Sequence, residues 1–245
     1  MKILAIGDPH GKTSNLPKEN FDLIITTGDL GDATLAREFY FNNLKLRQKG
    51  LSEISLTKTN EKKIENQTQE STKKILKNLS KLAPTYTLEG NVEIDKINSL
   101  NKKKNISIVK NQLRVIKEIR IGFLDYFLDT SWAKEFKPKD KEALEKARKE
   151  TKKATKILKR FKNLDILVCH QPPYKILDKV SKKYNPPKNW IGKNAGSKLI
   201  LDFIKNQKPK TVLCGHIHEC KGKKIIGKTI VYNLGHSGDY KVLNI

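Results

Sequence analysis

Four of the five histidines of this 245-residue sequence lie in short polar turns that follow apolar runs. They are His10, His170, His216 and His218, and each turn also contains glycine or proline. Aspartates occupy the same or similar turns. Imidazole nitrogen and carboxylate oxygen together suit Mn, Fe, Zn or Ni, whereas Mg and Ca prefer mostly oxygen. The residue types therefore predict a transition-metal site.

The spacing within two of these turns allows chelation. Asp8 and His10 are two residues apart, as are His216 and His218, and side chains two apart point to the same side of an extended segment. A carboxylate can bridge two metal ions, and Asp29 is the candidate bridge. Two ions about 3.5–4 Å apart stabilise the attacking and leaving oxygens of an in-line displacement. The pattern favours hydrolysis of a phosphoester.

Five short apolar runs must position these side chains, since each run ends at one of the polar turns. The runs cover residues 3–6, 23–25, 85–88, 166–169 and 212–214. Their length and composition predict strands, and α/β sheets place their ligands at the ends of strands. The sequence therefore predicts an α/β protein with its site at strand ends.

The five turns occur in a defined order along the chain. They read Asp-x-His at Asp8 and His10, Gly-Asp-x-x-Asp at Asp29 and Asp32, Gly-Asn at Asn91, a lone histidine at His170, and Gly-His-x-His at His216 and His218. In this order they closely resemble the motifs of the calcineurin-like metallophosphoesterases. Segments 170–174, 196–198 and 215–219 look most like the prokaryotic, Icc-type branch of that family.

The resemblance implies a fold and a set of metal ligands. The fold would be a four-layer α/β sandwich, with two mixed β-sheets packed face to face and flanked by helices. One metal would be held by Asp8, His10, Asp29 and His218, and the other by Asp29, Asn91, His170 and His216. Asp32 would support these ligands, although a turn or helix-cap role explains it too.

The implied activity is that of a metal-dependent phosphodiesterase or phosphatase. Two divalent transition-metal ions are expected, with Mn first and Fe, Zn or Ni as alternatives. A hydroxide bridging the ions would attack phosphorus, with Asp29, Asn91 and His10 as the catalytic residues. Asn91 would stabilise charge on the phosphoryl oxygens. The partner would be a phosphoester substrate, with a nucleotide or nucleic acid among the candidates.

The sequence departs from the family pattern directly after Asn91. Many members carry a histidine there that is thought to protonate the leaving group, whereas this chain has Val92 followed by Glu93. A bound water, His10 or His236 could take that role, and the sequence leaves these alternatives open. For His236 itself a structural role is favoured.

Other residues near the motifs carry less specific signals. Trp132 and Trp190 could stack on a nucleobase, but anchoring an insertion is the favoured interpretation. Segment 194–197 fits a helix N-terminus as well as a substrate loop. Candidates for orienting the ligands are Glu93, Glu219 and Tyr174.

Two lysine-rich stretches, at about 35–82 and 134–163, predict helical insertions in a single domain covering residues 1–245. In the second stretch, apolar residues recur every three or four positions and predict one narrow buried stripe. The stripe contains Leu144, Ala147, Thr151, Ala154, Leu158 and Phe161. Residues 50–72 are polar and poor in large apolar side chains, which predicts a mobile segment. Residues 106–124 predict a meander or hairpins.

The formal charge of +24 and the pI near 9.8 raise the expectation of a polyanionic partner. Nearly all basic residues are lysine, however, whereas phosphate and base recognition favour arginine. A compositional bias is therefore favoured over a dedicated polyanion surface. The alternatives are a nuclease of the same fold and a weakly catalytic module that binds nucleic acid or protein.

The three cysteines, Cys169, Cys214 and Cys220, argue by their odd number against a secreted disulfide framework. No apolar stretch approaches the roughly 20 residues that span a bilayer. Residues 2–6 predict a strand rather than a signal peptide. We therefore expect a cytoplasmic protein without a membrane segment.

Overall fold

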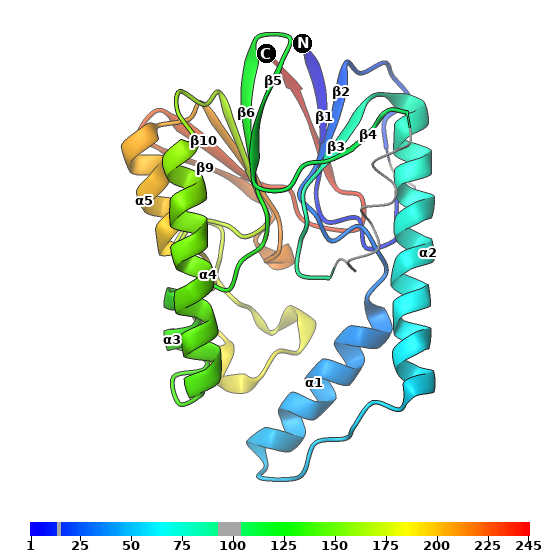
Figure 1. Ribbon diagram of the computed structural model, residues 1–245, viewed down its shortest axis with the longest axis vertical. Coiled ribbons are helices and arrows are strands. Elements are labelled where there is room, and N and C mark those ends of the chain that lie inside the picture. Colours follow the sequence, from blue (N-terminus) through cyan, green and yellow to red (C-terminus); the bar gives the residue numbers. More distant parts are fainter. Residues whose placement is uncertain (14–15, 93–103) are drawn as a thin grey trace.

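The computed structural model describes residues 1–13, 16–92 and 104–245, and two β-sheets form its centre (Figure 1). The strands of the first sheet are β1 (Lys2–Ile6), β2 (Leu23–Thr26), β3 (Thr85–Thr87), β4 (Ile106–Ile108) and β11 (Tyr240–Asn244). Their order is β11-β1-β2-β3-β4. β1 to β4 pair in parallel, while β11 is antiparallel to β1, so the sheet is mixed.

The second sheet is also mixed. Its strands are β5 (Gln112–Ile116), β6 (Ile119–Leu124), β7 (Ile166–Cys169), β8 (Thr211–Cys214), β9 (Gly222–Ile226) and β10 (Thr229–Asn233). Their order is β5-β6-β7-β8-β10-β9. The four central strands are parallel, and the two edge strands β5 and β9 are antiparallel to their neighbours.

Five α-helices lie around the sheets in the part of the chain that the structure describes. They are α1 (Thr34–Gln48), α2 (Lys58–Leu82), α3 (Thr130–Phe136), α4 (Lys141–Arg160) and α5 (Lys198–Gln207), and short 3₁₀ turns cover Lys182–Tyr184, Lys188–Trp190 and His218–Cys220. Figure 1 shows α2 beside the first sheet and α4 and α5 beside the second. It also shows α1, α3 and the segment between β7 and α5 reaching beyond the sheets at one end.

Alternation of side chains along the strands builds the inner layers. Ile3 and Ala5 of β1 point to one face and join a buried cluster between the sheets that includes Phe123 of β6. Leu4, next along β1, points to the other face and packs in a cluster with Leu76 of α2. Successive side chains of a strand alternate between faces, so a nearly continuous apolar run can serve two layers.

The outer face of the second sheet is covered in the same way. Leu167 of β7 packs in a buried cluster with Leu158 and Phe161 at the end of α4 and with Phe203 of α5. The order of layers is therefore α2, first sheet, second sheet, and α4 with α5. This arrangement confirms the predicted four-layer α/β sandwich of two mixed sheets flanked by helices.

The predicted stripe on the second lysine-rich stretch lies on α4. Ala147, Ala154 and Leu158 are buried, as is Phe161 just after the helix, while Leu144 and Thr151 are half-buried. Over the part of the chain that the structure describes, no helix is both long enough and apolar enough to cross a bilayer.

The prediction for residues 106–124 was correct for one hairpin and wrong for the first strand. β5 and β6 form an antiparallel hairpin. β4 instead pairs in parallel with β3 in the other sheet, where Ile106 and Ile108 pack in the cluster under α2. A short apolar run can pair with a strand of either sheet, so its sequence does not specify the partner strand. Packing of Ile106 and Ile108 in the cluster under α2 favours the first sheet.

The prediction of a mobile segment at residues 50–72 was wrong from residue 58 onward, because α2 begins there. Its contacts in this region are polar or small rather than large and apolar. Thr68 and Thr72 are buried, and a Cβ on Gly31 would lie 2.6 Å from atoms of both. Ser71 Oγ accepts the backbone N–H of Asp32 at 2.8 Å. This part of α2 therefore holds the turn that follows Asp29.

Replacing Leu76 tests the packing of α2 on the first sheet. Leu76 is 0% exposed, whereas Leu82 on the same helix is 51% exposed. Leu76→Ala is expected to lower the free energy of unfolding by about 2–5 kcal/mol, because it leaves a cavity. The control Leu82→Ala should change it by less than about 0.5 kcal/mol. Urea unfolding followed by circular dichroism measures both, and equal effects would contradict this packing.

Candidate metal centre

The predicted ligands come together at the carboxyl ends of parallel strands. Asp8 and His10 follow β1, Asp29 follows β2, Asn91 follows β3, His170 follows β7, and His216 and His218 follow β8. Backbone hydrogen bonds tie the turns to one another. The His10 N–H donates to the Asp29 carbonyl, and the Gly215 N–H donates to the His170 carbonyl, each at 2.9 Å.

Three of these residues have left-handed backbone conformations. The φ angles are 44° at His10, 46° at Asp29 and 64° at His216. Such angles are unfavourable for residues with a Cβ and persist where the surroundings enforce them. The turns therefore hold their side chains in fixed directions toward a common point.

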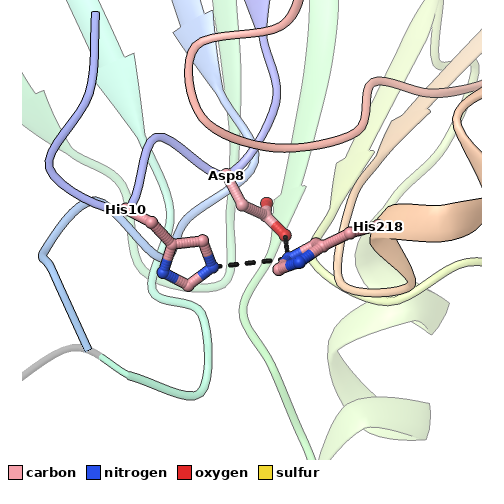
Figure 2. A group of neighbouring side chains, drawn as sticks. All are labelled: Asp8, His10 and His218. Atoms are coloured by element: carbon pink, nitrogen blue, oxygen red, sulfur yellow. Dashed lines mark hydrogen bonds and ion pairs between the residues drawn. The ribbon is translucent and has the colours of Figure 1, made fainter. Parts of the chain in front are cut away.

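Asp8, His10 and His218 form the first group (Figure 2). The two Nε2 atoms of the histidines are 3.3 Å apart, and Oδ2 of Asp8 is 3.3 Å from Nε2 of His218. A metal bound at about 2.0–2.2 Å holds its nitrogen and oxygen ligands about 3.0–3.5 Å from one another. The spacing of the group fits one such ion.

Asp29 lies between this group and His170. Its Oδ2 atom is 3.7 Å from Nε2 of His10 and 3.6 Å from Nε2 of His170. Its Oδ1 atom accepts the backbone N–H of Val92 at 3.0 Å. Because Oδ1 is held in this way, Oδ2 faces both histidines, as a bridging carboxylate requires. Asp8, Asp29 and His170 also form a second possible ligand group.

The side chain of Asn91 completes the second half of the site. Its Oδ1 atom is 2.7 Å from Nε2 of His170 and 3.0 Å from Nδ1 of His216. Nδ1 of His170 donates to the carbonyl of Thr27 at 2.8 Å. This bond leaves Nε2 of a neutral His170 with a lone pair facing the acceptor Oδ1, a pair of acceptors that a shared cation can satisfy. The donor set fits a metal ion.

Glycine is required at two positions next to the carboxylates. A Cβ on Gly215 would lie 2.2 Å from Oδ1 of Asp8, and a Cβ on Gly90 would lie 2.2 Å from Oδ1 of Asp29. No side chain fits at these distances. The glycines of the Gly-Asn and Gly-His-x-His motifs therefore let the backbone approach the buried carboxylates.

Charge interactions in the site keep Asp8 ionised. Burial raises the pKa of Asp8, but the charge of His170 and the hydrogen bond from His218 outweigh burial, and the net shift is downward. Burial also lowers the pKa of His170, yet the carboxylates of Asp29 and Asp8 reverse this and raise it. The buried carboxylates thus attract a proton to the neighbouring imidazole. The same negative charge would attract a metal cation.

His10 and His216 favour their neutral form. Burial lowers the pKa of His10, and it lowers the pKa of His216 strongly, with the charge of His170 adding to the effect at His216. The charge of Arg37 acts in the same direction on both. Neutral imidazole is the form that binds a metal ion.

His236 lies against the site, although its sequence context favoured a structural role. Its ring centroid is 4.7 Å from that of His218. The hydroxyl oxygen of Tyr184 lies 2.5 Å from its Nε2 atom, and its Nδ1 atom is 2.6 Å from Oγ of Ser237. Both ring nitrogens thus have a partner, and the ring of His236 packs against that of His218.

The other residues singled out in the sequence lie outside the ligand cluster. Asp32 accepts the N–H of Thr34 at 2.9 Å, near the start of α1. Glu219 accepts the N–H of Ser181 at 2.8 Å, and Ser197 caps α5. The Tyr174 N–H donates to the Ser197 carbonyl at 3.0 Å. Glu93 lies outside the described residues.

Sequence reasoning missed several residues that contact the ligands. Thr27 donates its hydroxyl to Oδ1 of Asp8 at 2.6 Å, in addition to accepting from His170. The ring of Tyr126 lies 5.7 Å from that of His170 and 5.6 Å from that of His216. Thr27 directly precedes the Gly-Asp motif, which was a usable signal, whereas Tyr126 follows β6 without any motif.

A cavity of about 1310 Å³ opens onto one side of the centre. Asp29, Asn91, His216 and His218 are among its lining residues, while His170 is 0% exposed behind them. The ligand cluster is therefore accessible from the cavity, while His170 is buried.

The whole chain, residues 1–245, matches the family model described as metallophosphoesterase, calcineurin superfamily. With the four-layer sandwich and the Asp, His and Asn cluster at its strand ends, this match shows that the chain belongs to the calcineurin superfamily of metallophosphoesterases. The finer assignment to the prokaryotic, Icc-type branch stays a prediction. No curated protein matches the chain.

Several solved structures share the fold at low sequence identity. One is 17% identical with a TM-score of 0.69, covering 99% of this chain and 94% of that chain. A phosphopantetheinyl hydrolase from Mycobacterium tuberculosis is 12% identical with a TM-score of 0.51, covering 97% and 90%. A dimetal phosphatase from Danio rerio is 9% identical with a TM-score of 0.51, covering 98% and 88%. Likeness at this level shows the fold alone.

The protonation of His236 makes stability depend on pH. Burial, followed by the charge of His218, lowers its pKa to about 4, against 6.5 in an unfolded chain. Between these values the unfolded chain binds a proton that the folded chain does not, so stability falls as pH falls from about 6.5 to 4. His236→Gln is expected to reduce that fall. Thermal unfolding of metal-free protein at pH 7 and pH 5 measures it, and an unchanged pH dependence would contradict this assignment.

Proposed function

We propose that the chain is a metal-dependent phosphoester hydrolase, a phosphodiesterase or phosphatase, that works as one domain with two divalent transition-metal ions. The observation that carries the proposal is the position of Asp29. Its Oδ2 atom lies between His10 and His170 at 3.7 and 3.6 Å, at the wall of a cavity large enough for a substrate. Membership of the metallophosphoesterase superfamily supports a hydrolase of this kind.

The ligand assignment divides the cluster into two overlapping sets. One ion would be held by Asp8, His10, Asp29 and His218, and the other by Asp29, Asn91, His170 and His216. The measured spacings within both halves support this division. Mixed imidazole and carboxylate donors favour Mn, Fe, Zn or Ni, and we place Mn first.

The two ions, when bound, supply an activated water and stabilise charge at phosphorus. The chain's own residues fix the geometry of this step. Thr27 holds Asp8 through its hydroxyl and His170 through its carbonyl, so both ligands keep their orientation. Asn91 lines the cavity, where its amide N–H can donate to a phosphoryl oxygen. His10 is the third catalytic residue we propose.

A nuclease of the same fold and a weakly catalytic binding module are the alternatives, and the net charge of +24 motivates both. The same assay separates them when short nucleic acids are offered beside small esters. A cytoplasmic location is likewise part of the proposal.

Asp29→Asn tests the bridging carboxylate. Loss of one negative charge between the two ions is expected to lower Mn-dependent hydrolysis of bis-p-nitrophenyl phosphate and p-nitrophenyl phosphate by at least about 100-fold. Asp202→Asn, which changes an exposed aspartate of α5, is the matched control and should leave the rate unchanged. Removal of metal by a chelator should abolish the wild-type rate, and addition of Mn should restore it.

The proposal fails if metal-loaded wild-type protein hydrolyses neither ester faster than the Asp29→Asn variant. Salt-sensitive binding of nucleic acid that survives metal removal, without hydrolysis, would instead indicate a binding module.

Thr27→Val tests how far the ligands depend on their support. The variant keeps the shape of the side chain and the backbone carbonyl but removes the hydrogen bond to Asp8. Loss of such a supporting bond is expected to weaken Mn affinity by about 10–100-fold. Thr26→Val removes a buried hydroxyl that bonds Thr87 instead and serves as control. Calorimetric titration with Mn measures both, and equal affinities would contradict a supporting role for Thr27.

A further inference from the structure

The wall of the cavity is unusually aromatic. Both tryptophans of the chain line it, together with three of its seven tyrosines and three of its eight phenylalanines. These residues come from α1, α3, the loop after β6, and the segment between β7 and α5. Figure 1 shows these elements grouped beyond one end of the sheets. The aromatic surface is therefore assembled from distant parts of the chain.

Trp132, Phe136 and Trp190 form one compact group, which we call the aromatic cluster. Trp132 stacks on Phe136 with ring centroids 5.0 Å apart, and Trp190 meets both edge-on at 5.8 and 5.1 Å. The cluster packs on buried Ile217, which stands between His216 and His218. The apolar surface thus adjoins two candidate metal ligands. Both tryptophans are half-buried, so part of each ring is exposed.

Arg37 of α1 contributes a cation to the same cavity. Its guanidinium lies 5.8 Å from the ring centroid of Tyr184 and 6.0 Å from that of Phe41. Among the ion pairs of the described residues none involves Arg37, whereas Arg47 on the same helix pairs with Glu53 at 2.6 Å. Guanidinium binds phosphate oxygens through paired N–H donors.

The other charges of the cavity wall do not favour a long polyanion. Lys146 lies 3.9 Å from Glu150, so its charge is partly compensated. Lys137 and Lys153 line the cavity too, together with Glu65, so positive and negative side chains are mixed along its wall. The volume of about 1310 Å³ exceeds the roughly 300–1,000 Å³ typical of small-molecule sites, so it admits a phosphate together with a sizeable organic group.

We propose that the cavity binds a phosphoester whose organic group carries an aromatic ring, with the ring on the aromatic cluster and Arg37 on the phosphate. The inference rests on the proposed function, because the phosphorus must lie at the metal centre. Ring stacking selects an aromatic ester over an alkyl one, whereas Arg37 would bind the phosphate of either.

The test compares phenylphosphonate with methylphosphonate on the Mn-loaded wild-type protein. The two ligands share the phosphorus head group, and their P–C bond is not an ester, so affinity is measured without turnover. Calorimetric titration is expected to show phenylphosphonate binding about tenfold tighter, equivalent to about 1.4 kcal/mol. Since both tryptophans line the cavity, phenylphosphonate should also change the intrinsic fluorescence.

Three substitutions test which residues cause the preference for phenylphosphonate over methylphosphonate. Trp190→Leu should reduce the ratio of the two affinities to less than threefold, while leaving methylphosphonate affinity unchanged. Arg37→Gln should weaken both ligands by a similar factor of about tenfold. Arg47→Gln, on the solvent side of α1 and paired with Glu53, should weaken neither. Circular dichroism confirms that each variant is folded.

Equal affinity of the wild-type protein for both phosphonates would overturn the inference, whatever the variants show. If hydrolysis of bis-p-nitrophenyl phosphate persists in that case, the proposed function stands and only the substrate class falls. Tighter, salt-sensitive binding of a thymidine decanucleotide than of thymidine monophosphate would also overturn it, in favour of a nucleic-acid groove. Tighter binding of adenosine monophosphate than of ribose 5-phosphate would support the inference and indicate that the aromatic ring is a nucleobase.

Discussion

The carboxylate of Asp8 is fully buried at the ends of the central strands. A buried charge is strongly unfavourable unless neighbouring groups compensate it. Thr27 after β2 donates a hydroxyl to one oxygen, and the backbone N–H of His216 after β8 donates to the other. His170 and His218 add positive charge. The turns after β1, β2, β7 and β8 must therefore meet at Asp8. Because β1 and β2 belong to the first sheet and β7 and β8 to the second, the buried carboxylate of Asp8, a candidate metal ligand, also fixes how the two sheets lie relative to each other.

Position 92 shows how a motif can change its side chain and keep its structural role. The family pattern often has histidine there, and this chain has valine. The backbone N–H of Val92 still holds Oδ1 of Asp29 at 3.0 Å, a contact that any residue except proline can make. The geometry of the carboxylate therefore does not depend on the missing histidine.

The lysine-rich helices divide their charge and their contacts between two faces. On α4, Lys149 and Arg148 lie within 3.8 and 3.5 Å of Glu145 on the outer surface, and Ala154 and Leu158 pack on the second sheet. Residues of α1, α2, α3 and α4 together line the cavity. Part of the high net charge thus lies on solvated faces, while the cavity wall combines aromatic residues with Arg37 and with Lys137, Lys146 and Lys153.

From the sequence alone we predicted the ligand set, the strands that carry it and the buried stripe of α4, because two-residue, helical and motif spacings are local. The four-layer class followed from the resemblance of the ordered motifs to a known family. The tertiary structure alone decided that β4 joins the first sheet, that α2 extends back to Lys58 through polar contacts with the Asp29 turn, and that Thr27, Tyr126, Tyr184 and Arg37 surround the ligands. These contacts join segments distant in the chain. Their partners follow from strand order and helix packing, which no local periodicity encodes.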